Sequence, residues 1–235
     1  QYKGMFSNGW LEEDRFLSYS YLHQKYFYLR VNIGPWSGTG GIIHNAQWGG
    51  THPSLGQLPQ SFGDFLRVVT GRAASESSNA PGSDLTNVIG NSLAAYEFGL
   101  RYENEKFTAS LTRLFYLEDK VSTRFRSPWD GVWGANIKFK DKGKFINGIT
   151  YEHVNTKQMD YKSWEPIGAA DYYDHSVYRH GWTYENDVMG IPLILFENDD
   201  IVNNVLVAHH LGVRGQLTEN VNYKSIFTYS RNYGI

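Results

Sequence analysis

The residues best suited to ligand chemistry lie together in the stretch 171–184. Flat aromatic rings can cover the apolar faces of pyranose rings, and Arg or His can pair with the carboxylates of uronic acids. The pattern therefore predicts a polysaccharide-binding loop. The same residues could instead fold the loop into a plug inside a wide β-barrel, and the two roles could coexist. The residues concerned are Tyr172, Tyr173, His175, Tyr178, Arg179, Trp182 and Tyr184.

A second polar group precedes this loop in the chain. His44 and Trp48, with Asn45 between them, are further candidates for contact with a polysaccharide. Asp64 and Arg67 could join them, although an Asp–Arg pair three residues apart on a helix is usually a local ion pair. A structural role and a ligand contact both remain open for this group.

Neither metal binding nor catalysis is predicted. His209 and His210 are adjacent on a strand and point to opposite faces, while His175 and His180 are too loosely spaced to indicate a zinc site. Paired carboxylates for glycoside hydrolysis can be drawn from several acidic residues, but no motif singles out two of them. These residues are Glu97, Glu118, Asp130, Glu152 and Asp174. We expect a non-catalytic protein without cofactor or metal.

Composition narrows the classes of protein. The chain has 22 basic and 24 acidic residues, which argues against a nucleic-acid partner. Aromatic residues make up 16%, a content that suits the interfacial girdles of membrane barrels. There is no cysteine, and no apolar run approaches the roughly 20 residues of a spanning helix. If the chain crosses a membrane, it must do so with strands.

Period-two alternation predicts four pairs of strands. The first pair covers 17–21 and 26–33, with a turn at His23-Gln24. The others are 96–102 with 106–118, 133–139 with 145–155, and 205–214 with 221–229, joined by turns at 103–105, 141–143 and 218–220. A short helix is predicted near 61–69, with Ser61 as N-cap and Asp64 in its first turn.

Each predicted strand has one apolar face and one face of charged and amide groups. A soluble sandwich would give the same alternation. Strands of about 9–12 residues and the contrast between short turns and long connections favour a barrel. We therefore expect an all-β protein: residues 1–235 form an antiparallel transmembrane outer-membrane β-barrel with short periplasmic turns and long extracellular loops. The long loops are expected at about 34–94, 119–131 and 156–202. Arg30, Arg101, Lys138 and Arg214 are expected on the inner wall.

Several short sequence motifs in the predicted loops occur in a specific order. They are His44–Thr51, Gly56–Pro59, Ser61–Val69, Gly90–Leu93, Asp130–Gly134, Tyr151–Thr156, Asp171–Tyr184 and Gly190–Leu193. Together they resemble the capsule assembly Wzi family in the form found in Bacteroidetes. The resemblance implies a monomeric outer-membrane barrel of about eighteen strands, of which this chain would be a part. It also implies a lectin-like role in holding capsular polysaccharide. Lys157–Asp160 stand where the family pattern has Gln-Ser-Gly, which puts any role of that loop in doubt.

The sequence thus predicts a protein of the bacterial outer membrane that binds surface or capsular polysaccharide and assists capsule assembly or attachment. Its expected partners are that polysaccharide and outer-membrane lipid, with contact to other outer-membrane proteins left open. One alternative is an outer-membrane channel or transport-complex component. Another is a soluble β-sandwich lectin or polysaccharide-degrading enzyme.

Overall fold

The computed structural model describes residues 2–11, 15–76, 79–118, 125, 127–141, 145–158, 171–185 and 187–234. Its long strands are β1 (Tyr2–Trp10), β2 (Tyr21–Ile33), β3 (Trp36–Trp48), β6 (Asn91–Glu103), β7 (Phe107–Leu117), β8 (Gly131–Phe139), β9 (Gly148–Asn155), β14 (Val205–Thr218) and β15 (Val221–Gly234). Short strands form three separate ladders: β4 (Thr51–His52) with β5 (Gly56–Gln57), β10 (Thr183–Tyr184) with β11 (Asp187–Val188), and β12 (Leu195–Glu197) with β13 (Asp200–Asn203). The two helices are α1 (Phe62–Thr70) and α2 (Gly82–Thr86).

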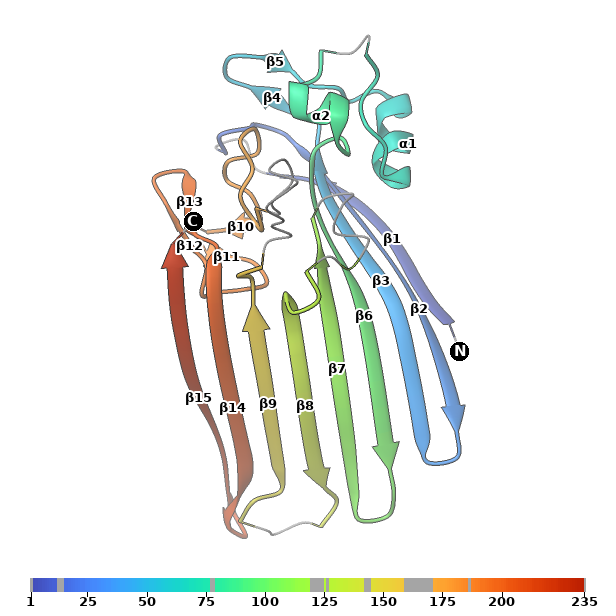
Figure 1. Ribbon diagram of the computed structural model, residues 1–235, viewed down its shortest axis with the longest axis vertical. Coiled ribbons are helices and arrows are strands. Elements are labelled where there is room, and N and C mark those ends of the chain that lie inside the picture. The colour runs from blue at the N-terminus through green and yellow to red at the C-terminus, as the bar shows by residue number, and fades with distance from the viewer. Residues whose placement is uncertain are drawn as a thin grey trace.

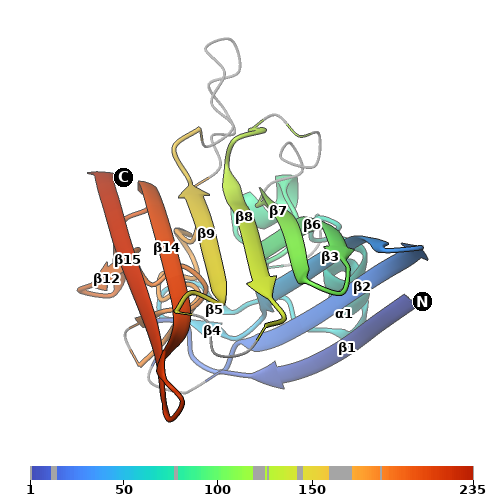
Figure 2. The ribbon, with the colours of Figure 1, turned by 90° about the horizontal axis from the view of Figure 1, so that it is seen from below.

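The nine long strands form one antiparallel sheet. Its order is β1-β2-β3-β6-β7-β8-β9-β14-β15, so each long strand pairs with the next long strand along the chain. The sheet is curved, and β1 and β15 lie at its two ends (Figures 1 and 2). The predicted all-β, antiparallel architecture is therefore confirmed.

Short and long connections lie at opposite ends of the sheet. The tight hairpins β2–β3, β6–β7 and β14–β15 turn within a few residues at the lower end in Figure 1. The connections 49–90 and 156–204 gather at the upper end, together with both helices and the small ladders. The predicted turns at 103–105 and 218–220 are confirmed, whereas the turn at 141–143 lies partly outside the described residues.

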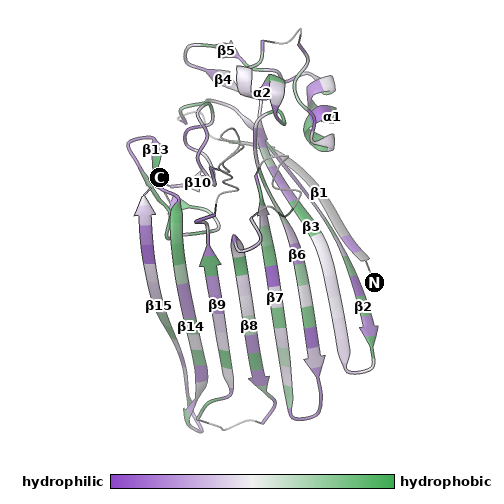
Figure 3. Ribbon diagram, in the orientation of Figure 1, coloured by the Kyte–Doolittle hydropathy of each residue, from purple (hydrophilic) through white to green (hydrophobic). Residues whose placement is uncertain are grey.

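One face of the sheet is apolar, and its side chains are exposed. The register places Leu29 opposite Gly40, Gly40 opposite Phe98, and Leu100 opposite Leu111, so these positions share a face across four strands. Figure 3 shows the resulting alternation along the strands. We call this the apolar face. Its exposed members include Phe27, Leu29, Val31, Ile33, Trp36, Ile42, Phe98, Leu100, Leu111, Trp133, Tyr151, Leu211, Phe227 and Tyr229.

The opposite face, which we call the polar face, carries most of the charged positions of the long strands, whereas Lys25, Arg113 and Arg231 lie on the apolar face. Arg30, Arg101, Lys138 and Arg214, which were predicted to lie on the inner wall of a barrel, all share this one face of the sheet. The Tyr28 hydroxyl donates to Glu97 Oε2 at 2.5 Å across two strands of this face. At the lower end, Glu103 accepts from both Arg101 (2.7 Å) and Lys140 (2.8 Å). Glu103 is thus paired with two basic groups at this end of the sheet.

Two strand predictions were wrong. His23-Gln24 is not a turn, because β2 is continuous from Tyr21 to Ile33 and pairs with β1 on its other side. Residues 36–48 are not loop but β3, so the connection expected at 34–94 begins only after Trp48. The glycines of β3 interrupt the alternation of apolar and polar residues by which strands were predicted, although they have a packing role. A Cβ on Gly41 would lie 2.2 Å from the Tyr28 ring, so glycine leaves room for that ring on the polar face.

The predicted first helix is confirmed as α1. The Ser61 hydroxyl accepts from the Asp64 amide at 3.2 Å, and the Asp64 carboxylate accepts from the Ser61 amide at 2.9 Å. This reciprocal pair is a capping box, and Gly71 ends the helix in the left-handed conformation. Val68 and Phe65 pack the helix onto Trp48 at the upper end of β3. Neither helix in the described ranges has the length and apolarity that a membrane-crossing helix needs.

Candidate functional site

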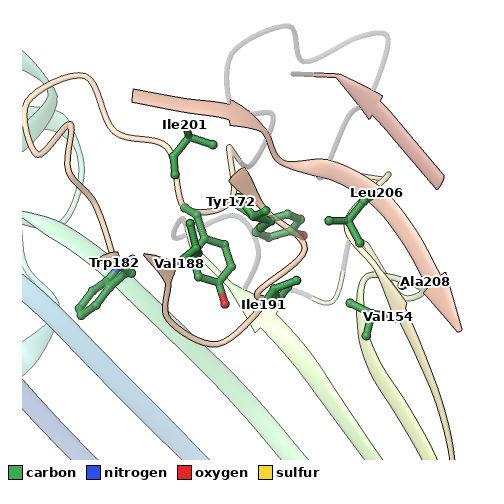
Figure 4. Close-up of a cluster of buried hydrophobic side chains, with 10 residues drawn as sticks. Val154, Tyr172, Trp182, Val188, Ile191, Ile201, Leu206 and Ala208 are labelled. Carbon is green, nitrogen blue, oxygen red and sulfur yellow. The ribbon is translucent and has the colours of Figure 1, made fainter. Parts of the chain in front are cut away.

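The connection 171–204 is a folded unit packed on the upper end of the sheet. Its apolar side chains contact Val154 of β9 and Leu206 and Ala208 of β14 (Figure 4). Leu93, Tyr116 and Val132 extend the contact to β6, β7 and β8. Val154 and Ala208 are opposite each other on the polar face, so the unit covers the upper part of that face. The unit is therefore packed against the sheet and is not a free surface loop.

Tyr172 joins two connections, 156–204 and the one between β7 and β8. Its hydroxyl donates to Asp130 Oδ2 at 3.0 Å, and Asp130 Oδ1 accepts from the Gln158 amide at 2.9 Å. Its ring packs edge-on against Tyr116, with the ring centroids 5.4 Å apart. Burial, reinforced by the Asp130 carboxylate, holds the pKa of Tyr172 well above its ordinary value, so its hydroxyl remains a donor.

Most aromatic rings of the predicted sugar platform are interior. Tyr172, Tyr173, Tyr178 and Trp182 are all at most 5% exposed. The Tyr178 hydroxyl donates to the Gly49 carbonyl at 3.4 Å, which ties the unit to the end of β3. Tyr184 alone among the five rings is exposed, at 57%. In this arrangement the four buried rings form core and offer no face for stacking on a sugar.

His175 and Arg179 lie differently, because both line a polar cavity. His175 Nδ1 accepts from the amides of Val177 (3.1 Å) and Tyr178 (3.2 Å), which fixes the turn that begins this wall. Arg179 pairs with Asp200 at 2.9 Å and lies over the Phe16 ring, 5.0 Å from its centroid. Burial lowers the pKa of His175 to about 4, so the imidazole is neutral at physiological pH.

The cavity has a volume of about 370 Å³ and lies between residues 83–92 and 171–200. Asp84 and Asn91 are buried lining residues, each 1% exposed. Asp84 Oδ2 accepts from the Gly90 amide at 3.1 Å, and burial raises the pKa of Asp84 to about 6. Gly90 has φ +80°, and a Cβ there would lie 2.1 Å from the Gln47 carbonyl oxygen. The close approach of the chain to β3, just before β6 begins, therefore requires glycine.

The earlier group of candidates does not reach this cavity. His44 and Trp48 lie on the apolar side of β3, where His44 Nδ1 is 2.9 Å from Lys25 Nζ and Trp48 packs on Tyr21. Asp64 is engaged in the capping box, and Arg67 donates to the Ala73 carbonyl at 3.0 Å. These residues therefore have structural roles, and the fold does not place them beside residues 171–184.

Sequence reasoning did not select the acidic lining. Asp84, Asp171 and Asp200 come from separate segments, and their grouping with Asp174 and Glu118 follows only from the fold. Asp171 also accepts from Asn204 Nδ2 at 2.8 Å, which holds the start of the unit to its end. Within the described ranges, no group of three or more His, Asp or Glu side chains is arranged to hold a metal ion.

The His175 turn should loosen in acid. Because its pKa falls from 6.5 to about 4 on folding, its contribution to stability is complete above pH 6.5 and is lost as the pH falls from 6.5 towards 4. Protonated Nδ1 cannot accept the two amide bonds. We expect the free energy needed to open the 171–204 unit to fall by on the order of 2 kcal/mol between pH 7 and pH 4.5. Proteolysis between residues 171 and 185 should therefore be faster at pH 4.5 than at pH 7.

The matched variant is His175→Asn. An Asn side chain at this position can accept the same amide bonds as an Asx turn but does not titrate. Its proteolysis should therefore be nearly independent of pH over this range. Equal pH dependence in both proteins would assign the loosening to another group.

The chain has no significant match among protein-family models, curated proteins or solved structures.

Proposed function

We propose that this chain is a segment of a bacterial outer-membrane β-barrel that binds surface or capsular polysaccharide at its loop end, without catalysing a reaction. The apolar face is the observation that carries the membrane part of the proposal. It runs across the sheet from β2 to β15 with large side chains exposed, such as Ile33 at 72% and Phe227 at 65%. Water would strongly disfavour so large an apolar surface, whereas lipid would match it.

The strand lengths and the two ends of the sheet support the same proposal. Strands of 13–14 residues such as β3 and β14 exceed the 9–11 or so that a tilted strand needs to cross a bilayer, which leaves their ends outside the hydrocarbon. Trp36 and Tyr102, with ring centroids 4.8 Å apart, lie at the lower end where an aromatic girdle is expected. The loop end would then face the outside of the cell.

The polysaccharide part rests on the family resemblance and on the cavity at the loop end. The resemblance to the capsule assembly Wzi family supplies the ligand class. The cavity supplies polar groups that could bind hydroxyls, while the buried aromatic rings act as the scaffold that holds them. Binding therefore depends on residues such as Asp84 and Asn91 more than on Tyr172 or Trp182.

The test uses the full-length protein in its native membrane and after extraction. We expect it to remain in outer-membrane fragments through carbonate and urea washes and to be released only by detergent. The detergent-solubilised protein should bind capsular polysaccharide purified from the same organism saturably. Cells that lack the protein should shed capsule or anchor it poorly.

Three results would contradict the proposal. Release of the protein without detergent would favour the soluble sandwich. A fully normal capsule on cells lacking the protein would remove the capsule role. A steady conductance in planar bilayers, without polysaccharide binding, would favour the channel alternative.

A further inference from the structure

The cavity at the loop end is lined by a buried polar donor that has no partner among the described residues. Asn91 is 1% exposed, and its Nδ2 makes no hydrogen bond within the part of the chain that the structure describes. The register pairs Asn91 with Gln47, whose Nε2 donates to the Gly181 carbonyl at 2.6 Å. Asn91 therefore shares the side of the sheet that faces the 171–204 unit. A buried amide left unpaired is costly, and an acceptor oxygen of a ligand would remove that cost.

The remaining lining is dominated by acceptors. Among the described residues, five carboxylates line the cavity: Asp84, Glu118, Asp171, Asp174 and Asp200. The cationic group among the lining residues, Arg179, is already bound to Asp200, and His175 uses Nδ1 as an acceptor. Burial, together with Asp171 and Asp200, raises the pKa of Asp174, which is the effect expected of a negative field.

This charge pattern selects among sugars. A uronic acid would bring a further carboxylate beside those of the cavity and would be repelled. Hydroxyl groups, or an ammonium group, would donate to the carboxylates, and a sugar oxygen could accept from Asn91 Nδ2. The lining residues Asn87, Asp171 and Ser176 are exposed, so the cavity is open to the solvent.

We propose that the cavity between residues 83–92 and 171–200 binds a neutral or amino-bearing sugar unit and discriminates against uronic acids. This inference rests on the proposed polysaccharide-binding function and specifies its substrate class. It also reverses the expectation that Arg179 and His175 attract acidic sugars, because both groups are already engaged within the protein.

Ligand-observed saturation-transfer NMR with the full-length protein in detergent micelles tests the inference at pH 7.5. The probes are methyl galactoside, glucosamine and glucuronate, measured at equal concentration, together with the intact capsular polysaccharide. We expect saturable signals from methyl galactoside and glucosamine and at least tenfold weaker binding of glucuronate.

Two variants place the binding in this cavity. Asn91→Ala removes the free donor and should weaken binding of methyl galactoside about fivefold to tenfold, whereas Asn222→Ala, in the hairpin at the opposite end of the sheet, should leave it unchanged. Asp84→Asn keeps an acceptor for the Gly90 amide and removes one charge. This variant should bind glucosamine more weakly and glucuronate more strongly than the unchanged protein. Misfolding would not produce such a change in selectivity.

The outcomes separate this inference from the proposed function. Glucuronate binding as strong as that of the other probes, or unaltered selectivity in Asp84→Asn, would overturn the inference. Binding of the polysaccharide without binding of any neutral or amino probe would also overturn it and leave the proposed function intact. Failure of the polysaccharide itself to bind would refute the proposed function.

Discussion

Replacing Leu111 by Arg should lower the free energy of unfolding in lipid vesicles by about 2–4 kcal/mol, the cost of a cation near the middle of a barrel's lipid-facing surface. Leu111 lies in β7, pairs with Leu100 and Ala135 on the apolar face, and is 59% exposed. If lipid covers this face, the guanidinium must lose its hydration. Urea titration of the full chain folded in vesicles measures the difference.

The next residue provides the matched control. Thr112 is at the same height but on the polar face, opposite Gly99 and Gly134, which leave room for a longer side chain. Thr112→Arg should therefore change stability by no more than about 0.5 kcal/mol. Equal losses for both variants would contradict the assignment of the apolar face to lipid. A large loss for Leu111→Arg in the absence of lipid and detergent would point to a protein layer covering that face.

The strands that could be predicted from the sequence are those with regular alternation and short turns. The β6–β7 and β14–β15 hairpins combine both signals, and their turns fall at the expected residues. β3 was missed because Gly38, Gly40 and Gly41 dilute its apolar positions, and because one of its two pairing partners, β6, lies far along the chain. β1 was missed for a related reason: its role becomes evident only when β2 is read as one continuous strand.

The sequence predicted which residue types gather at the loop end, but it did not predict which of their side chains are exposed. The 171–184 stretch was selected because it is rich in aromatic residues, and those residues do define a distinct unit. Their burial follows from contacts with Val154, Leu206 and Ala208, which only the sheet brings into reach. The acidic cavity follows from the same long-range folding, because Asp84 reaches it from a connection almost ninety residues before Asp171.

The buried aromatic rings allow the scaffold and ligand roles of this loop to be separated. Tyr172→Ala should open the 171–204 unit, because it removes a ring that is 0% exposed and deletes the bond to Asp130. Loss of a large buried ring costs about 3–5 kcal/mol. Hydrogen exchange of the amides between residues 172 and 206 should rise by several hundredfold, and polysaccharide binding should fall as a consequence.

Two companion variants decide the interpretation. Tyr172→Phe keeps the ring and loses only the hydrogen bond. It should lower the free energy needed to open the 171–204 unit by about 1–3 kcal/mol, because Asp130 is left without that donor. Tyr184→Ala removes the exposed ring of the same loop and should leave exchange unchanged. If Tyr172→Ala weakened polysaccharide binding with no increase in exchange, the ring would contact the ligand directly. The buried arrangement would then be only one of two conformations of the loop. An increase in exchange that parallels the loss of binding across the three variants would instead make Tyr172 a residue that holds Asp130 and the 171–204 unit in place around the cavity.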